Sequence, residues 1–141
     1  MADEAVKITL LGNAGDPVEY TVAAGTAIPK GTLMKISASP QIAIATDGIG
    51  KVFAGIASVE KTATDGVTEL ALWTHGLFEM TCGAAESMVL GAPVKTGAVA
   101  NEVMVADTDV IQGSAAVVGI AQETVAGNGT GAVLINVGRT R

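Results

Sequence analysis

The chain has 141 residues and a formal net charge of −6, with only eight lysines and arginines scattered along it. Nucleic-acid binding uses clustered basic side chains, so this composition argues against a nucleic-acid partner. Apolar residues make up 49% of the chain, but the longest uncharged runs, 110–122 and 124–138, contain glycines and are shorter than the roughly 20 residues of a membrane-spanning helix, which argues against a membrane partner.

The first eleven residues are predicted to form an extended N-terminal arm. Val6, Ile8 and Leu10 alternate with Lys7 and Thr9, which is the period-two pattern of a strand, and six turn-forming residues follow. The chain starts with a short acidic segment instead of the basic and apolar stretches of a secretory signal. We therefore expect a soluble product that is made inside the cell.

Residues 12–141 are predicted to form a single β domain. Short alternating or apolar runs separated by Gly, Asn, Asp and Pro indicate strands and turns. The expected strands are Val18–Ala23, Leu33–Ile36, Gln41–Ala45, Val52–Glu60, Val67–Thr74, Asn101–Ala106, Ala116–Thr124 and Ala132–Val137. Gly83–Leu90 and Asp107–Ala116 have room for only a turn or two of helix. The predicted fold is all-β, a compact barrel-like or sandwich-like domain.

The tripeptide Gly-Ile-Ala occurs at Gly55–Ala57 and again at Gly119–Ala121, in similar surroundings. Other glycines recur at similar offsets: Gly31 and Gly91 are 60 residues apart, and the two tripeptides are 64 apart. We predict two copies of one β unit, over residues 28–76 and 88–138, with about four residues inserted in the second copy before its tripeptide. A glycine inside a strand marks a bend or a close approach, so the repeated glycine indicates a corner of a small barrel or sandwich.

A catalytic site is hard to find in this sequence. His75 is the only histidine, and no nearby pattern supplies both a nucleophile and an orienting carboxylate. Cys82 lies near His75 in sequence, so a small hydrolase using His75 with Cys82 or a serine is an alternative, although no oxyanion-hole segment is recognisable. The single cysteine also argues against a disulfide framework or a multi-cysteine metal site.

No cofactor or metal is predicted. Asp107 and Asp109 resemble a fragment of a cation loop, but the further oxygen ligands of a calcium loop are missing. Whether these two aspartates bind a cation stays open at this point, with a solvated acidic loop as the simpler interpretation.

Several segments together resemble the capsid cement, or head-decoration, proteins of tailed phages, a family first catalogued as a domain of unknown function. The resemblance is carried by the acidic start Ala2–Ala5, by Val18–Lys35, by Phe53–Ala57 and by Leu70–Phe78. It extends over most of the chain, is strongest over residues 18–78 and is weaker beyond Gly83. It rests on short β motifs and includes no catalytic signature.

The resemblance implies a structural virion protein with a β-tulip-type fold. Such proteins bind the outside of the expanded head, commonly as homotrimers at threefold and quasi-threefold positions, and bridge subunits of the major capsid protein. The expected location is therefore the capsid exterior, after synthesis in the host cytoplasm. The family's N-terminal arm adds a strand to the capsid surface, a mode of binding that uses backbone hydrogen bonds.

Two sets of residues are predicted to make these contacts. The arm residues expected to bind the capsid are Ala2, Asp3, Glu4, Ala5, Val6, Ile8 and Leu10. Trp73 and Phe78 are expected at a subunit or capsid interface, because aromatic anchors often dominate interface energetics. Two alternatives stay open: Val6–Leu11 is an edge strand of its own domain, and the chain is another self-assembling phage subunit such as a tail component.

Overall fold

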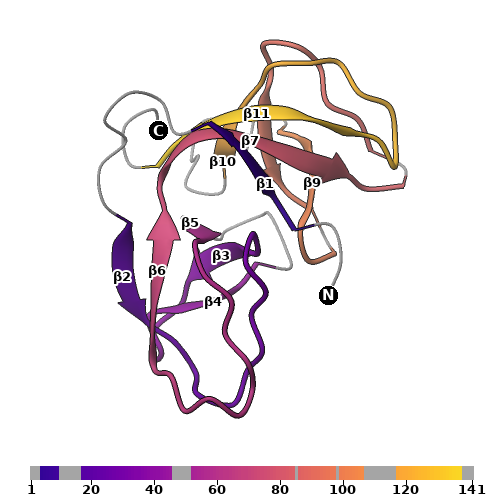
Figure 1. Cartoon of the computed structure of the whole chain (residues 1–141). Coiled ribbons are helices and arrows are strands. Elements are labelled where there is room, and N and C mark those ends of the chain that lie inside the picture. Colours follow the sequence, from indigo (N-terminus) through magenta and orange to yellow (C-terminus); the bar gives the residue numbers. More distant parts are fainter. Residues whose placement is uncertain are drawn as a thin grey trace.

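The computed structural model describes residues 4–9, 17–45, 52–84, 86–97, 99–106 and 117–137. These ranges contain eleven strands and no helix, so the all-β prediction is confirmed (Figure 1). The strands are β1 (Val6–Thr9), β2 (Val18–Thr21), β3 (Leu33–Ile36), β4 (Ile42–Ile44), β5 (Phe53–Ala57), β6 (Glu69–Trp73), β7 (His75–Cys82), β8 (Pro93–Thr96), β9 (Glu102–Val105), β10 (Val117–Ala121) and β11 (Thr130–Asn136). The described part of Gly83–Leu90 contains turns and an isolated bridge instead of helix.

The strands form two sheets with the same internal order. The first sheet has the order β2-β6-β5-β3-β4, and the second has the order β1-β7-β11-β10-β8-β9. If β1 is left out, the second sheet has the same strand order as the first. Strands β7, β11, β10, β8 and β9 then stand in the places of β2, β6, β5, β3 and β4. The chain is therefore two copies of one five-stranded unit, with β1 added to the second.

The two units match residue by residue around the Gly-Ile-Ala tripeptides. Gly55 pairs with Met34 and Ile56 with Leu33, and at the same places in the second unit Gly119 pairs with Val94 and Ile120 with Pro93. A register shift directly precedes the glycine in each unit, between Phe53 and Gly55 and between Val117 and Gly119. Each unit also contains an equivalent hydrogen bond 2.8 Å long: the Gly31 N–H donates to Ala57 O in the first unit, and the Gly91 N–H donates to Ala121 O in the second. The predicted duplication is therefore present in the hydrogen-bond pattern itself.

The repeat is longer than the predicted ranges 28–76 and 88–138. Val18 of β2 pairs with Leu72, and Phe78 of β7 pairs with Val133, so each unit begins one strand earlier. The sequence did not predict β7, because Gly76 within it and Gly83 directly after it indicate turns. The predicted insertion of about four residues is present: the pairings of Met34 with Ile44 and of Val94 with Val105 put one extra residue between β8 and β9, and the connection from β9 to β10 has eleven residues where that from β4 to β5 has eight.

The glycine of each tripeptide lies against the backbone of the neighbouring strand. A Cβ atom on Gly55 would lie 2.6 Å from the carbonyl oxygen of Trp73, and one on Gly119 would collide with the carbonyl oxygen of Leu134. Trp73 and Leu134 occupy equivalent positions, since they pair with Ile56 and Ile120. Only glycine fits such a close approach, which explains why both copies carry it.

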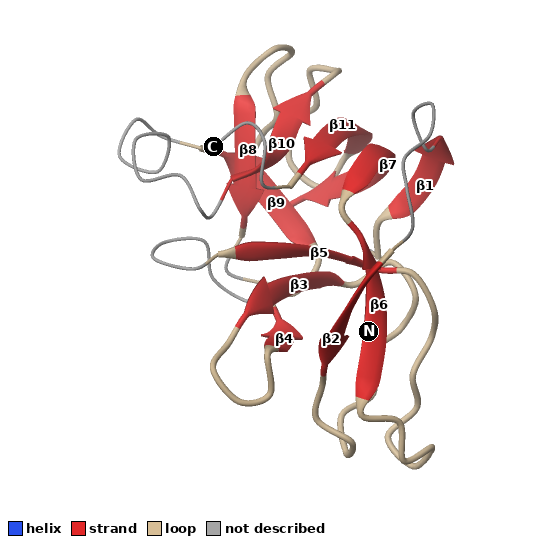
Figure 2. Cartoon of the chain, turned by 90° about the vertical axis from the view of Figure 1, so that its left-hand side faces the viewer, coloured by secondary structure: helices blue, strands red, loops and turns tan. Residues whose placement is uncertain are grey.

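The two units, which lie one above the other in Figure 2, close on themselves by different means. In the second unit β7 also pairs in parallel with β9, through Thr81 with Glu102 and Cys82 with Val103, so the strands form a closed barrel. In the first unit the equivalent strands β2 and β4 are linked by side chains. The Thr21 N–H donates to Gln41 Oε1 and the Gln41 N–H donates to Thr21 Oγ1, each over 2.9 Å. We call residues 17–74 barrel 1 and residues 75–137 barrel 2.

The interiors of the two barrels are separate, but one outer face of barrel 1 belongs to the core of barrel 2. The interior of barrel 1 forms a separate cluster that includes Met34, Ala57 and Leu72. The adjacent residues Leu33 and Ile56 point outward and join a larger cluster with the interior of barrel 2. Barrel 2 thus covers one outer face of barrel 1, and all five residues of β5 are buried. The chain passes directly from β6 into β7 where the barrels meet (Figure 1).

A buried lysine organises the outer loops of barrel 1. Lys61 is 1% exposed, and its ammonium group donates to the carbonyl oxygens of Ala24 at 2.6 Å, Thr26 at 2.9 Å and Thr62 at 3.2 Å. The Asp65 carboxylate lies 3.6 Å away. Barrel 2 has Val125 at the equivalent place, because Ile28 bridges Lys61 as Met88 bridges Val125.

Candidate functional site

The N-terminal segment is an edge strand of its own domain. β1 runs antiparallel to β7, with Val6 opposite Glu79 and Lys7 opposite Phe78. The Ala5 N–H donates to Gly31 O over 2.6 Å, and the Ala5 side chain is buried in the core. The expectation of a free arm over residues 1–11 is therefore wrong for Val6–Thr9, and the edge-strand alternative is correct there. The hydrophobic alternation of this segment fits both arrangements, so sequence alone did not separate them.

Only part of the predicted arm set has a described environment. Glu4 is half-buried, Ala5 is buried, and Val6 has 57% of its surface exposed. Of Ile8 the structure describes the backbone only. Ala2, Asp3 and Leu10 lie outside the described residues.

One edge of β1 is available to a partner. β1 is the last strand in its sheet, so its edge away from β7 pairs with no strand among the residues the structure describes. Such an edge presents a row of backbone N–H and C=O groups that accept an added strand. The backbone of β1 is thus fixed by β7 on one side and open on the other.

A hollow lies beside this open strand. Its volume is about 310 Å³, and it is lined by Glu4, Ala5, Val6, Lys30 and Trp73. The Lys30 ammonium lies 5.6 Å from the centre of the Trp73 ring, within cation–π distance. The hollow therefore combines an aromatic wall with one cation and one carboxylate, a set that suits a peptide segment with an apolar side chain. Lys30 was not predicted as a site residue, because its place in the hollow depends on the approach of β1 to barrel 1.

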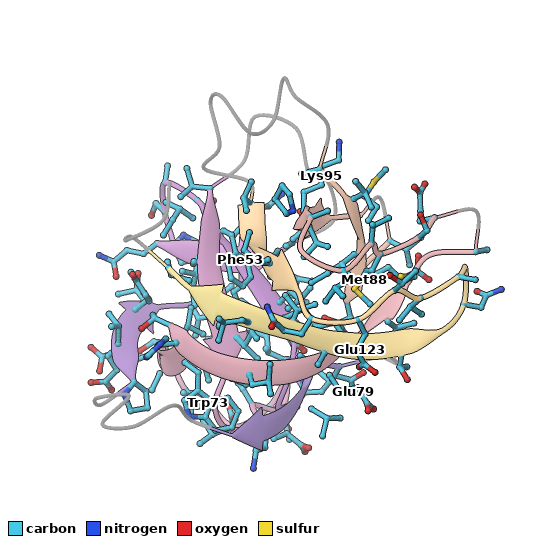
Figure 3. All side chains as sticks on the ribbon, turned by 90° about the horizontal axis from the view of Figure 1, so that it is seen from above. Phe53, Trp73, Glu79, Met88, Lys95 and Glu123 are labelled. Atoms are coloured by element: carbon cyan, nitrogen blue, oxygen red, sulfur yellow. The ribbon has the colours of Figure 1, made fainter. Side chains whose placement is uncertain are left out.

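The two predicted aromatic anchors have different environments. Trp73 is half-buried and lines the hollow, and Figure 3 labels its position. Its ring packs against Phe78, with centroids 5.6 Å apart and planes tilted by 43°. Phe78 itself is completely buried in the core, so its assignment to an interface is wrong for this chain. The residue alternates inward with Met80 and Cys82, a period-two signal that was present in the sequence.

His75 and Cys82 cannot act together as base and nucleophile in this fold. Both lie on β7, at opposite ends of the strand. Seven residues at about 3.3 Å each separate them by roughly 23 Å, and an odd spacing places the two side chains on opposite faces. Burial, reinforced by the charge of Glu86, raises the pKa of the Cys82 thiol, which disfavours the reactive thiolate. The hydrolase alternative therefore loses the pair of residues on which it was based.

Asp107 and Asp109 lie outside the described residues. Within the described ranges, no three His, Cys, Asp or Glu side chains are grouped so that they could hold a metal ion. No helix in those ranges is long and apolar enough to cross a membrane.

Comparison with known proteins adds no relative: no protein-family model matches the chain, and no curated protein matches it.

Proposed function

We propose that this chain is a capsid decoration, or cement, protein of a tailed phage. It would bind the outer surface of the expanded head and bridge neighbouring subunits of the major capsid protein. The observation that carries the proposal is the open edge of β1 beside the hollow that contains Trp73. The resemblance of residues 18–78 to decoration proteins suggests that the partner is a major capsid protein.

The contact would use two features that lie side by side. The open edge of β1 offers backbone hydrogen bonds to an extended capsid segment, which give affinity with little sequence preference. The hollow then receives one side chain of that segment against Trp73, while Lys30 and Glu4 face its polar groups. A partly exposed Trp in a pocket is a common hot spot, and its loss typically costs about 2 kcal/mol or more of binding free energy.

The remaining parts of the proposal follow from the resemblance to decoration proteins. The partners are the major capsid protein and further copies of this chain, in the homotrimer that the resemblance implies, with no nucleic acid, membrane or cofactor. The protein would lie on the capsid exterior after synthesis in the host cytoplasm. Its activity would be mechanical, because burying surface across subunit boundaries opposes their separation.

Binding to expanded heads tests the proposal. Removing residues 1–10 is a poor test here, because it deletes β1 and the buried Ala5. Val6→Arg instead places a bulky charge on the exposed part of β1 at the rim of the hollow. Val59→Arg is the matched control, since Val59 is 53% exposed, close to the 57% of Val6, and does not line the hollow.

Co-sedimentation with expanded heads of the encoding phage should show at least tenfold weaker binding for Val6→Arg and wild-type binding for Val59→Arg. Equal binding by all three proteins would exclude the β1 site. Electron microscopy of labelled virions addresses the tail-component alternative directly. Label on tails and none on heads would replace the decoration proposal.

A further inference from the structure

A row of apolar residues crosses the outer face of barrel 2. Pro93 of β8 pairs with Ile120 of β10, Ile120 pairs with Leu134 of β11, and Leu134 pairs with Leu77 of β7. Paired residues of neighbouring strands point to the same face of a sheet, so these four side chains form one continuous line. We call Leu77, Pro93, Ile120 and Leu134 the barrel 2 row.

The row faces away from the core. Val133 and Ile135, which flank Leu134 along β11, are fully buried and therefore point inward. Ile120 is 36% exposed, and the other three members of the row are half-buried. Leu90 is 63% exposed and occupies the position that Lys30 has in barrel 1. β11 and β7 run side by side across the view in Figure 3.

The same row exists in barrel 1, where it is covered. Leu33, Ile56 and Trp73 are the counterparts of Pro93, Ile120 and Leu134, by the same pairings. Leu33 and Ile56 are buried in the cluster that they share with barrel 2. Every residue of β5 is buried, whereas in β10 the counterpart of Ile56 is the single exposed residue. The intrachain contact thus shows how this face is packed when it has a partner.

The surface of barrel 2 that covers this row has a counterpart in barrel 1. Barrel 2 contacts the covered row through Phe78, which packs on Trp73, and through Asn101, whose side chain binds the Leu33 backbone. In barrel 1 the position of Phe78 is taken by Val18, since Val18 pairs with Leu72 as Phe78 pairs with Val133. Val18 is 42% exposed. Barrel 1 therefore carries an uncovered version of the surface that barrel 2 uses within the chain.

We propose that the barrel 2 row is covered by barrel 1 of a second copy of this chain, with Leu134, the counterpart of Trp73, packing on Val18 of that copy and Ile120 beside it. The contact repeats, between chains, the packing of barrel 2 on barrel 1 within one chain. It is a head-to-tail contact, in which two different surfaces meet, so successive copies close into a ring when the rotation allows. This inference is independent of capsid binding, because it concerns the free protein.

The mass of the free protein in solution is the first test. Wild type should sediment well above the 14.0 kDa of one chain. Ile120→Lys should raise the concentration of half-dissociation about 30-fold or more, as expected for the centre of an apolar interface. Val59→Lys is the control, since Val59 is more exposed than Ile120 and lies outside the row. If Ile120→Lys fails to fold by circular dichroism, Leu90→Lys replaces it.

Cysteine cross-linking tests the orientation of the contact. Val18→Cys and Leu134→Cys are prepared as separate proteins, oxidised alone and then as a mixture. A head-to-tail contact gives a disulfide-linked dimer only in the mixture. The native Cys82 is fully buried and should not react in the folded protein.

Three results would overturn the proposal. The first is a wild-type mass of one chain at every accessible concentration. The second is an unchanged mass for the folded row variant. The third is a cross-link formed by Leu134→Cys alone, which would mean that two rows face each other. A monomeric protein whose row variants fail to bind heads would instead assign the row to the capsid protein. None of these results bears on the β1 site, because Val6→Arg is measured on heads and not in free solution.

Discussion

The side-chain oxygen of Asn101 in barrel 2 accepts a hydrogen bond, 3.0 Å long, from the backbone N–H of Leu33 in barrel 1. Both residues are buried, at 1% exposure each. Asn101 also has a positive φ of 68°, a conformation that Asn tolerates better than most residues. One side chain thus satisfies a buried backbone group of the other barrel and shapes the turn before β9.

Asn101→Gly should destabilise the protein by about 1–3 kcal/mol, because glycine keeps the positive φ but leaves the Leu33 N–H buried without this acceptor. Asn128→Gly is the control, since Asn128 is exposed and has a similar φ of 64°. Chemical denaturation should show a change within about 0.5 kcal/mol for the control. Equal effects at both sites would show that the hydrogen bond contributes nothing.

The Gly-Ile-Ala glycines should be far less replaceable than a glycine in open space. Gly55→Ala and Gly119→Ala each force a methyl group against the backbone of β6 or β11, and we expect losses of about 1–3 kcal/mol or more. Gly25→Ala is the control, since a Cβ there meets nothing within 4 Å. Thermal unfolding of the three variants checks this, and a tolerated Gly119→Ala would contradict the close approach of Leu134.

Replacing Lys61 should loosen barrel 1 selectively. Lys61→Met retains most of the buried apolar stem but loses three hydrogen bonds from a charged donor, each of a kind worth about 1.5–3 kcal/mol. The expected loss is about 2 kcal/mol or more, after the exposed Ala24 and Thr26 carbonyls regain water. Hydrogen exchange should rise in residues 23–28 and stay unchanged in barrel 2. Val125→Met is the control for side-chain size at the equivalent position.

Asp65 should make stability fall in acid. Hydrogen bonds from the Val67 and Thr62 backbone N–H groups, with the charge of Lys61, lower the pKa of this carboxyl below its ordinary 3.8. A lowered folded-state pKa contributes stability above the unfolded-state pKa, and this is lost as pH falls through the folded-state value. Asp65→Asn should therefore be less stable than wild type at pH 7, with a gap that narrows below pH 3.8. A gap that is constant with pH in thermal unfolding would contradict this assignment.

The duplication could be predicted from the sequence because the same short motif recurs in both units. Gly55 and Gly119 each sit against a neighbouring strand, so the same tripeptide is needed twice. Alternation along Val18–Ala23 and Gln41–Ala45 likewise reflects one face packed inside a barrel. These signals require no knowledge of which strands are neighbours.

Other features depend on contacts between distant parts of the chain. The alternation of Phe78 with Met80 and Cys82 indicates an inward face, but it does not show that this face also packs on the outside of barrel 1. The hollow forms only where Glu4 and Val6 meet Lys30 and Trp73, and no short motif encodes that meeting. The bond from Leu33 to Asn101 spans 68 residues and is equally invisible to local patterns.

The contacts that close the two barrels differ in kind, and we expect barrel 2 to resist opening more than barrel 1. Barrel 2 is sealed by strand pairing between β7 and β9, whereas barrel 1 is sealed by the exposed Thr21 and Gln41. Water competes for those two bonds, so a load that pulls β2 from β4 opens barrel 1 first and lets it reseal when the load is removed. We therefore expect barrel 1 to open reversibly between β2 and β4 under a pulling force. Single-molecule force spectroscopy should record this as a small reversible extension before either barrel unfolds.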